Sequence, residues 1–144
     1  MPLNQETLSA SAEEQSNTRT ILVVEDDEAI SELITLILSQ ETPYKPLAAV
    51  DASEALRLAV NLKVDLFIID YYLPGMNGLE LYDMLHSKEE LQSVPALILT
   101  ASLEKHEQEL QERNVLGLKK PFELDELLLM IKKALASPAL REID

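Results

Sequence analysis

The sequence predicts an α/β fold in which an open, doubly wound parallel sheet of five strands is covered by five helices. Short continuous apolar runs alternate five times with longer stretches in which apolar residues recur every three or four positions. This alternation is typical of βαβ units, which form parallel sheets with helices on both faces. A length of 144 residues also suits a single compact core.

The first strand and helix give the clearest pattern. The β-branched run at residues 21–24 predicts a buried strand that ends in three consecutive acids, Glu25, Asp26 and Asp27. An apolar stripe then predicts a helix to about residue 40, capped by one of the last two acids. The next strand, residues 44–50, contains Pro46, which lacks a backbone donor and therefore favours an edge position.

The middle of the chain predicts two helices around another buried strand. An acidic capping box opens a helix over residues 51–60. The apolar strand at residues 66–69 stops at Asp70, and Leu73-Pro74-Gly75 predicts a turn. A third helix is expected to begin near Gly78.

The remaining elements repeat the alternation. They are a strand at residues 96–99 that ends in Thr100, a helix at 103–113, a strand at 115–119 and a helix at 123–135. The helix at 103–113 has little apolar surface, and we expect His106 on it, like His86, to lie at the surface. These boundaries predict a flexible leader at residues 1–18, a domain at 19–136 and a short tail at 137–144.

The composition excludes several classes of function. With 26 acidic and 12 basic side chains, the formal charge is −14, which repels nucleic-acid backbones and predicts no direct DNA or RNA binding. The absence of cysteine excludes thiolate metal sites and cysteine nucleophiles, and three glycines are too few for a nucleotide-binding loop. Without a signal segment or a long apolar run, we expect a cytoplasmic protein with no membrane partner.

Polar residues follow four of the five predicted strands. Glu25 and Asp26 end the first strand, Asp70 ends the third, Thr100 ends the fourth, and Lys120 follows the fifth. Because the carboxyl ends of parallel strands meet at one edge, we expect these side chains to converge there. Each taken alone is explained as a helix cap or a solvated charge, but the shared edge favours a joint role.

Converging carboxylates need a counter-charge. At about 4 Å, each pair repels by roughly 4 kcal/mol at an effective dielectric near 20. A divalent cation relieves this repulsion, and a donor set of oxygen atoms favours Mg²⁺, with Mn²⁺ as a second cation that the same ligands accept. We expect Asp26 and Asp70 to bind the ion directly and Glu25 to bind it through water.

A carboxylate beside Mg²⁺ can also accept a phosphoryl group. In this interpretation Asp70 is the nucleophile and becomes an acyl phosphate. Lys120 supplies positive charge against the phosphoryl oxygens, and Thr100 donates a hydrogen bond to them.

Four segments, ILVVEDD, FIIDYYLPGMNG, LILTAS and KKPF, resemble the receiver domain of two-component response regulators, and the resemblance covers residues 19–136. It implies the CheY-like, flavodoxin-like fold with strand order 2-1-3-4-5. It also implies that Glu25 and Asp26 are the acidic pair, Asp70 the phosphoacceptor and Thr100 the switch hydroxyl.

The resemblance implies further roles around the same edge. The backbone carbonyl of Tyr72 becomes an additional Mg²⁺ ligand, and the small Ala101 leaves the approach to the aspartate open. Lys120 precedes Pro121, often through a cis peptide in this family. A histidine kinase or a histidine phosphotransfer protein is the expected phosphoryl donor. The domain is then a regulatory phosphoacceptor and not an enzyme, since it catalyses only its own phosphorylation and slow dephosphorylation.

Gly117 departs from the family pattern. Receivers commonly carry Tyr or Phe three residues before the conserved lysine, and here glycine stands in that place. The usual aromatic relay from Thr100 therefore cannot operate. We still expect the polar helix at 103–113 to rearrange on phosphorylation. The family favours the face of the fourth helix, fifth strand and fifth helix for contacts with a downstream target or a second copy of the chain.

Two alternatives are weighed against this interpretation. A Mg²⁺-dependent phosphatase of the haloacid-dehalogenase type needs a second aspartate two residues after the nucleophile, but Tyr72 is there, and the chain has no room for a cap domain. A receiver-like scaffold that signals without phosphate is opposed by the intact acids, threonine and lysine, although Gly117 is compatible with it.

Overall fold

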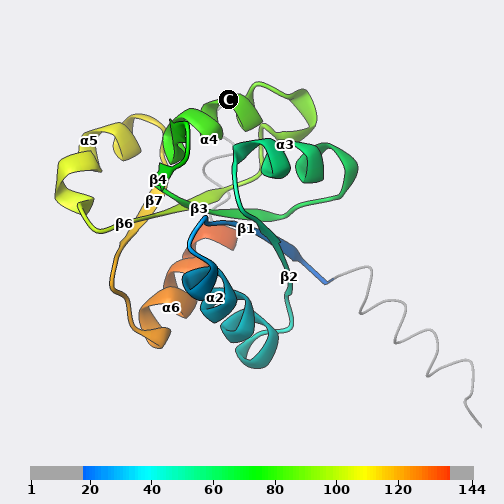
Figure 1. Ribbon diagram of the computed structural model, residues 1–144, viewed down its shortest axis with the longest axis vertical. Helices are drawn as coiled ribbons and strands as arrows, with labels where there is room; N and C mark the ends of the chain where they lie inside the picture. The colour runs from blue at the N-terminus through cyan, green and yellow to red at the C-terminus, as the bar shows by residue number, and fades with distance from the viewer. Residues whose placement is uncertain (1–17, 137–144) are drawn as a thin grey trace, which may run out of the picture.

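The computed structural model describes residues 18–136 as a five-stranded parallel sheet between two layers of helices (Figure 1). The strands run in the spatial order β2-β1-β3-β6-β7, which is 2-1-3-4-5 when these five are counted along the chain. The predicted fold class and strand order are therefore confirmed. The bounds are β1 (Thr20–Val24), β2 (Lys45–Ala49), β3 (Leu66–Asp70), β6 (Ala96–Thr100) and β7 (Leu116–Lys119).

The helices divide between the two faces of the sheet (Figure 1). One face is covered by α2 (Glu28–Glu41) and α6 (Leu124–Leu135), and the other by α3 (Ala52–Asn61), α4 (Gly78–His86) and α5 (Leu103–Glu112). Each face has its own apolar cluster, because alternate side chains of a strand point to opposite sides. Two separate cores thus hold the sheet in place.

The three central strands explain why the apolar runs are continuous. Every residue of β3 and β6 is buried, as are the last four residues of β1. Burial on both faces is what a parallel sheet requires of its inner strands. By contrast, β2 is half-exposed and lies at the edge, as Pro46 predicts.

Side-chain caps fix where the helices begin. Asp27 caps α2 by accepting from the amide of Ile30 at 3.1 Å, so it is the capping acid among the two candidates. The predicted cap of α3 is also present, with Asp51 accepting from the amide of Glu54 at 2.9 Å. Such caps satisfy backbone donors that the first helical turn leaves unpaired.

A short hairpin between β3 and α4 was not predicted beyond its turn. It pairs β4 (Tyr72–Leu73) with β5 (Met76–Asn77) in antiparallel fashion. Gly75 in its turn has a φ of +83°, a conformation that favours glycine. A 3₁₀ turn, η1 (Glu89–Leu91), lies in the charged connection after α4. The hairpin matters for the site because it begins two residues after Asp70.

Some apolar residues of the predicted helical stripes are exposed. Leu33 of α2 is 49% exposed and Leu124 of α6 is 40% exposed, although both belong to the apolar stripes of their helices. The sheet covers only the middle of each stripe, so residues at its margin or at a helix end remain in solvent.

Within residues 18–136, no helix has the length and apolar character to cross a membrane. The predicted tail and nearly all of the predicted leader lie outside these residues.

Candidate functional site

Glu25, Asp26 and Asp70 meet at the carboxyl edge of the sheet, as the strand ends predict. Each contributes one carboxylate oxygen, and these oxygens lie within 4.8 Å of one another. Glu25 and Asp70 are buried, whereas Asp26 is exposed. The cluster is therefore a half-open acidic site with two carboxylates below the surface and one at its rim.

Lys120 joins this cluster from the segment after β7. Its Nζ donates to Asp70 Oδ1 at 2.6 Å and to Glu25 Oε1 at 3.2 Å. Its backbone amide donates to the carbonyl of Thr100 at 2.9 Å, and its peptide bond to Pro121 is cis. Residues that are far apart in the sequence, such as Glu25 and Lys120, are thus in direct contact at this site.

Burial dominates the ionisation of the two inner carboxylates. It raises the pKa of Glu25 and of Asp70 above their ordinary values, although the ammonium group of Lys120 opposes both shifts. The pKa of Lys120 is raised despite burial, which works against its charge, because hydrogen bonds and attraction to Asp70 and Glu25 outweigh that penalty. The pKa of Asp70, the candidate phosphoacceptor, is therefore raised because burial of the cluster outweighs the attraction of Lys120.

Thr100 is buried at the end of β6, beside the acidic cluster. Its Oγ1 accepts from the backbone amide of Ser102 at 3.1 Å, which closes a tight turn before α5. Ala101, between them, is exposed. The Thr100 hydroxyl thus lies at the carboxyl end of β6 and is followed by a small exposed residue.

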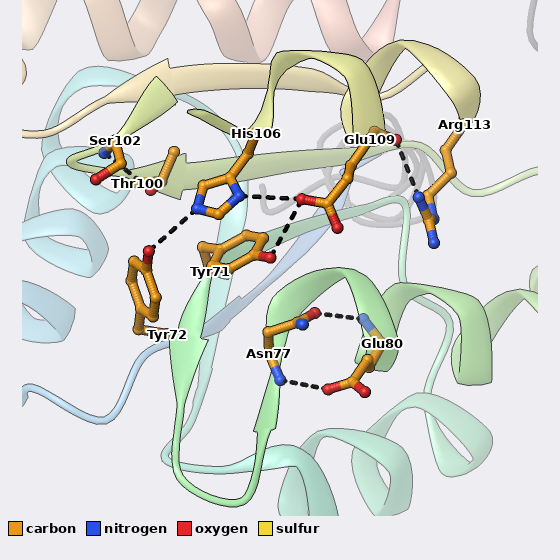
Figure 2. A network of polar contacts seen from close by, with 9 residues as sticks. All are labelled: Tyr71, Tyr72, Asn77, Glu80, Thr100, Ser102, His106, Glu109 and Arg113. Carbon is orange, nitrogen blue, oxygen red and sulfur yellow. Dashed lines mark hydrogen bonds and ion pairs between the residues drawn. The ribbon is translucent and has the colours of Figure 1, made fainter. Parts of the chain in front are cut away.

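Tyr72 contributes its backbone to the site and its side chain to a different contact. Its amide is hydrogen-bonded to the Asp70 carboxylate, which offsets part of the rise that burial causes in the pKa of that group. The phenol points away toward α5 and forms a hydrogen bond with His106 Nε2 at 3.1 Å (Figure 2). One residue therefore links the acidic cluster to a surface helix.

Gly117 lies in β7, where α5 packs directly against the strand. A Cβ at this position would come within 2.6 Å of Leu103 Cδ1 and 2.7 Å of Leu110 Cδ1. The apolar ends of two α5 leucines thus occupy the space beside the glycine.

Three residues were missed or misassigned from the sequence. His106 is 5% exposed, so its prediction as a surface histidine is wrong; the ring is covered by Tyr71, with ring centroids 3.7 Å apart. His86 is half-buried, and its Nε2 contacts the carbonyl of Val94 at 2.7 Å. Gly78 was placed only as a helix start, yet a Cβ there would lie 2.5 Å from the backbone oxygen of Asp70.

The donor set fits a divalent cation. Three carboxylates and one ammonium leave a formal excess of two negative charges in a small space. All candidate ligand atoms are oxygens, which hard cations prefer over softer metals. Glu25 and Asp70 offer carboxylate oxygens below the surface, and Asp26 offers one at the rim.

Comparison with known proteins identifies the class. The family model of the response regulator receiver domain matches residues 21–132, which is most of the chain. The structure of the chemotaxis response regulator CheY4 of Vibrio cholerae superimposes with a TM-score of 0.75 at 29% identity, covering 82% of this chain and 99% of that one. TrrA from Thermotoga maritima, solved in complex with Mg²⁺-BeF, gives a TM-score of 0.72 at 30% identity, covering 81% and 99% respectively.

This chain belongs to the receiver-domain family of two-component response regulators. Among curated relatives, the phosphate regulon transcriptional regulatory protein PhoB of Pseudomonas aeruginosa is 33% identical over 125 residues. The match covers 81% of this chain but 52% of PhoB. The chain thus spans about half the length of the curated relatives it matches.

Proposed function

We propose that Asp70 is the phosphoacceptor of this receiver domain and takes a phosphoryl group from a phosphohistidine. The observation that carries the proposal is the contact of Lys120 Nζ with Asp70 Oδ1 at 2.6 Å, inside a cluster that also contains Glu25 and Asp26. A carboxylate held by one of its oxygens and flanked by positive charge is oriented for in-line attack.

The transfer is a single displacement at phosphorus. A carboxylate oxygen of Asp70 forms a bond to phosphorus while the bond to the histidine nitrogen breaks, and the imidazole keeps the electron pair and takes up a proton. Lys120 stabilises the negative charge of the transferred group, and the Thr100 hydroxyl donates a hydrogen bond to it. The domain acts on itself once per phosphoryl group, so its role is regulatory.

Mg²⁺, with Mn²⁺ as a substitute, is the cofactor that the donor set supports. Asp26 and Asp70 would bind it directly, Glu25 through water, and Tyr72 through its backbone carbonyl. When bound, the ion supplies positive charge against the phosphoryl oxygens. The buried carboxylates keep the ligand oxygens in place, since Glu25 is also held by the amide of Asp27 at 3.1 Å.

The partners follow from the same chemistry. We assign a histidine kinase or a histidine phosphotransfer protein as the donor, and residues 19–136 as the domain that it modifies in the cytoplasm. PhoB carries the name of a transcriptional regulatory protein, but the acidic charge of this chain still favours a protein partner over direct DNA contact by this domain. A second copy or a downstream protein would bind the face formed by α5, β7 and α6. Sedimentation of the protein in both phosphorylation states tests whether it self-associates.

Incubation with a small-molecule phosphodonor and Mg²⁺, followed by intact-mass analysis, tests the assignment of Asp70. The wild type should gain one phosphoryl group, and Asp70→Asn should gain none. Asp51→Asn is the matched control, because asparagine keeps the cap of α3 while removing a carboxylate elsewhere, and it should still be phosphorylated. Unchanged mass in the wild type would instead favour a scaffold that signals without phosphate.

A further inference from the structure

His106 is a buried polar residue on a helix that is otherwise mostly polar and exposed. Only 5% of it is accessible, and the ring contacts three neighbouring side chains (Figure 2). The ring stacks on Tyr71 with an interplanar angle of 20°, Nε2 contacts the Tyr72 hydroxyl at 3.1 Å, and Nδ1 contacts Glu109 Oε1 at 3.0 Å. A side chain with this many specific contacts has a defined position.

One tautomer of the imidazole satisfies both polar contacts. With the proton on Nδ1, the ring donates to Glu109, and Nε2 can accept from the Tyr72 hydroxyl. Glu109 Oε1 also accepts from the Tyr71 hydroxyl at 3.3 Å. The two tyrosines that directly follow Asp70 are therefore both tied to the same surface helix, α5.

Tyr72 has few other restraints on its side chain. It belongs to a two-residue strand and is 52% exposed, so little apolar burial holds its ring. The rings of Tyr71 and His106 meet it edge-on, at centroid distances of 4.8 Å and 5.9 Å. The hydrogen bond to His106 is the contact that anchors the end of the side chain and, through it, the backbone beside Asp70.

We propose that His106 is a positioning residue for phosphoryl transfer to Asp70: by holding the Tyr72 phenol, it fixes the backbone segment that lies against the phosphoacceptor. The inference rests on the proposed function of Asp70 and adds a residue to it. It also places α5 in the reaction, because any movement of this helix reaches the site through Tyr72. The coupling does not use Gly117, which has no side chain to take part.

A double-mutant cycle between Tyr72 and His106 tests the proposal. Tyr72→Phe removes only the hydroxyl, and His106→Phe removes both nitrogens while keeping a ring against Tyr71. The measurement is the rate of phosphoryl gain by intact mass with a small-molecule donor. Each single variant should react about two- to tenfold more slowly, as expected for loss of the Tyr72–His106 hydrogen bond, which both changes remove, and the double variant should be no slower than the slower single variant.

Arg113→Ala is the matched control at the C-cap of the same helix. Its guanidinium pairs with Asp83 at 2.9 Å and donates to the backbone carbonyl of Glu109 at 3.0 Å, but it contacts neither the Tyr72 hydroxyl nor the His106 ring, so the variant should react at the wild-type rate. A second readout is amide hydrogen exchange at residues 71–73 without donor or Mg²⁺, which should be faster in both single variants and unchanged in Arg113→Ala.

The outcomes separate this inference from the proposed function. Wild-type rates in both single variants, or rate losses that simply add in the double variant, would overturn the role of His106 while leaving Asp70 as the acceptor. A wild type that gains no phosphoryl group would overturn the proposed function itself, and this inference with it. Faster exchange at residues 71–73 together with non-additive rate losses would support the positioning role over a merely structural one.

Discussion

Gly117 of β7 faces Leu103 of α5 so closely that a Cβ on the glycine would lie 2.6 Å from Leu103 Cδ1. Here α5 packs against β7 through its own leucine side chains, because the glycine contributes none. An aromatic ring at this position would need the space that Leu103 and Leu110 fill in this chain. The departure from the family pattern is thus matched by the packing of α5.

Replacing Gly117 by alanine should destabilise the domain. The new Cβ would displace the terminal methyl groups of Leu103 and Leu110, and overpacking of this kind typically costs about 1–3 kcal/mol. We expect the lower end, because leucine ends can turn aside. Urea unfolding checks this. Adding Leu103→Ala to Gly117→Ala should cost less than the sum of the two single changes, and simple additivity would contradict the packing argument.

Gly78→Ala should damage both stability and phosphorylation. Its Cβ would meet the backbone oxygen of Asp70 at 2.5 Å and the Cα of Tyr71 at 3.1 Å, and backbone atoms cannot turn aside. We expect a loss of about 2–3 kcal/mol and slower phosphoryl gain. Gly75→Ala is the control, since no atom lies within 4 Å of its Cβ and only its positive φ costs about 1–2 kcal/mol. Its phosphorylation rate should stay near that of the wild type.

Lys120→Met should reduce stability at neutral pH and less so in mild acid. Without the ammonium, the buried carboxylates of Glu25 and Asp70 lose their partner, which costs about 3 kcal/mol for a buried pair. Burial already raises the pKa of both acids in the folded state. As pH falls through these raised values, the folded protein takes up protons before the unfolded chain does, and the penalty shrinks.

Urea unfolding at about pH 7.5 and about pH 5.5 measures this difference. Lys119→Met is the neighbouring control, because Lys119 is exposed and lies 4.0 Å from Glu104 at the surface. It should change stability by less than about 0.5 kcal/mol at either pH. Equal losses for Lys120→Met at both values would show that the two carboxylates are not the cause.

Affinity for Mg²⁺ should fall as the pH is lowered, beginning above the range in which ordinary carboxylates titrate. The reason is that protons compete for Asp70 and Glu25, and burial raises the pKa of both. Calorimetric titration at about pH 7.5 and about pH 5.5 should give a weaker Kd at the lower value. Asp70→Asn should bind weakly at both. A Kd that does not change with pH in the wild type would contradict a role of these two carboxylates in holding the ion.

The fold could be predicted because its signals are local. A run such as residues 66–69 and the acid that ends it are visible in the sequence, and parallel strands necessarily bring their carboxyl ends to one edge. The convergence of Glu25, Asp26 and Asp70 follows from that geometry alone. The strand order, in contrast, came from the family resemblance, since periodicity does not specify which strands are neighbours.

The contacts of His106 could not be predicted in the same way. Its partner Tyr72 is 34 positions away and belongs to the β4-β5 hairpin that follows β3. The helical pattern around His106 is polar, which favours a surface position for any histidine on it. The proximity of Gly78 to Asp70 could not be predicted for a similar reason. It depends on the hairpin of β4 and β5, and the sequence indicates only the turn of that hairpin.

Because all five strands of the sheet are parallel, the acidic cluster lies at their carboxyl ends, and their amino ends form the opposite edge. The exposed Lys63 precedes β3 and so lies at the amino edge, away from the acidic cluster. Since the sequence contains no cysteine, a Lys63→Cys variant would present a single thiol for a fluorophore or for immobilisation on a sensor chip. The protein could then be labelled or immobilised through the amino edge of the sheet while the acidic cluster at the carboxyl edge faces the solution.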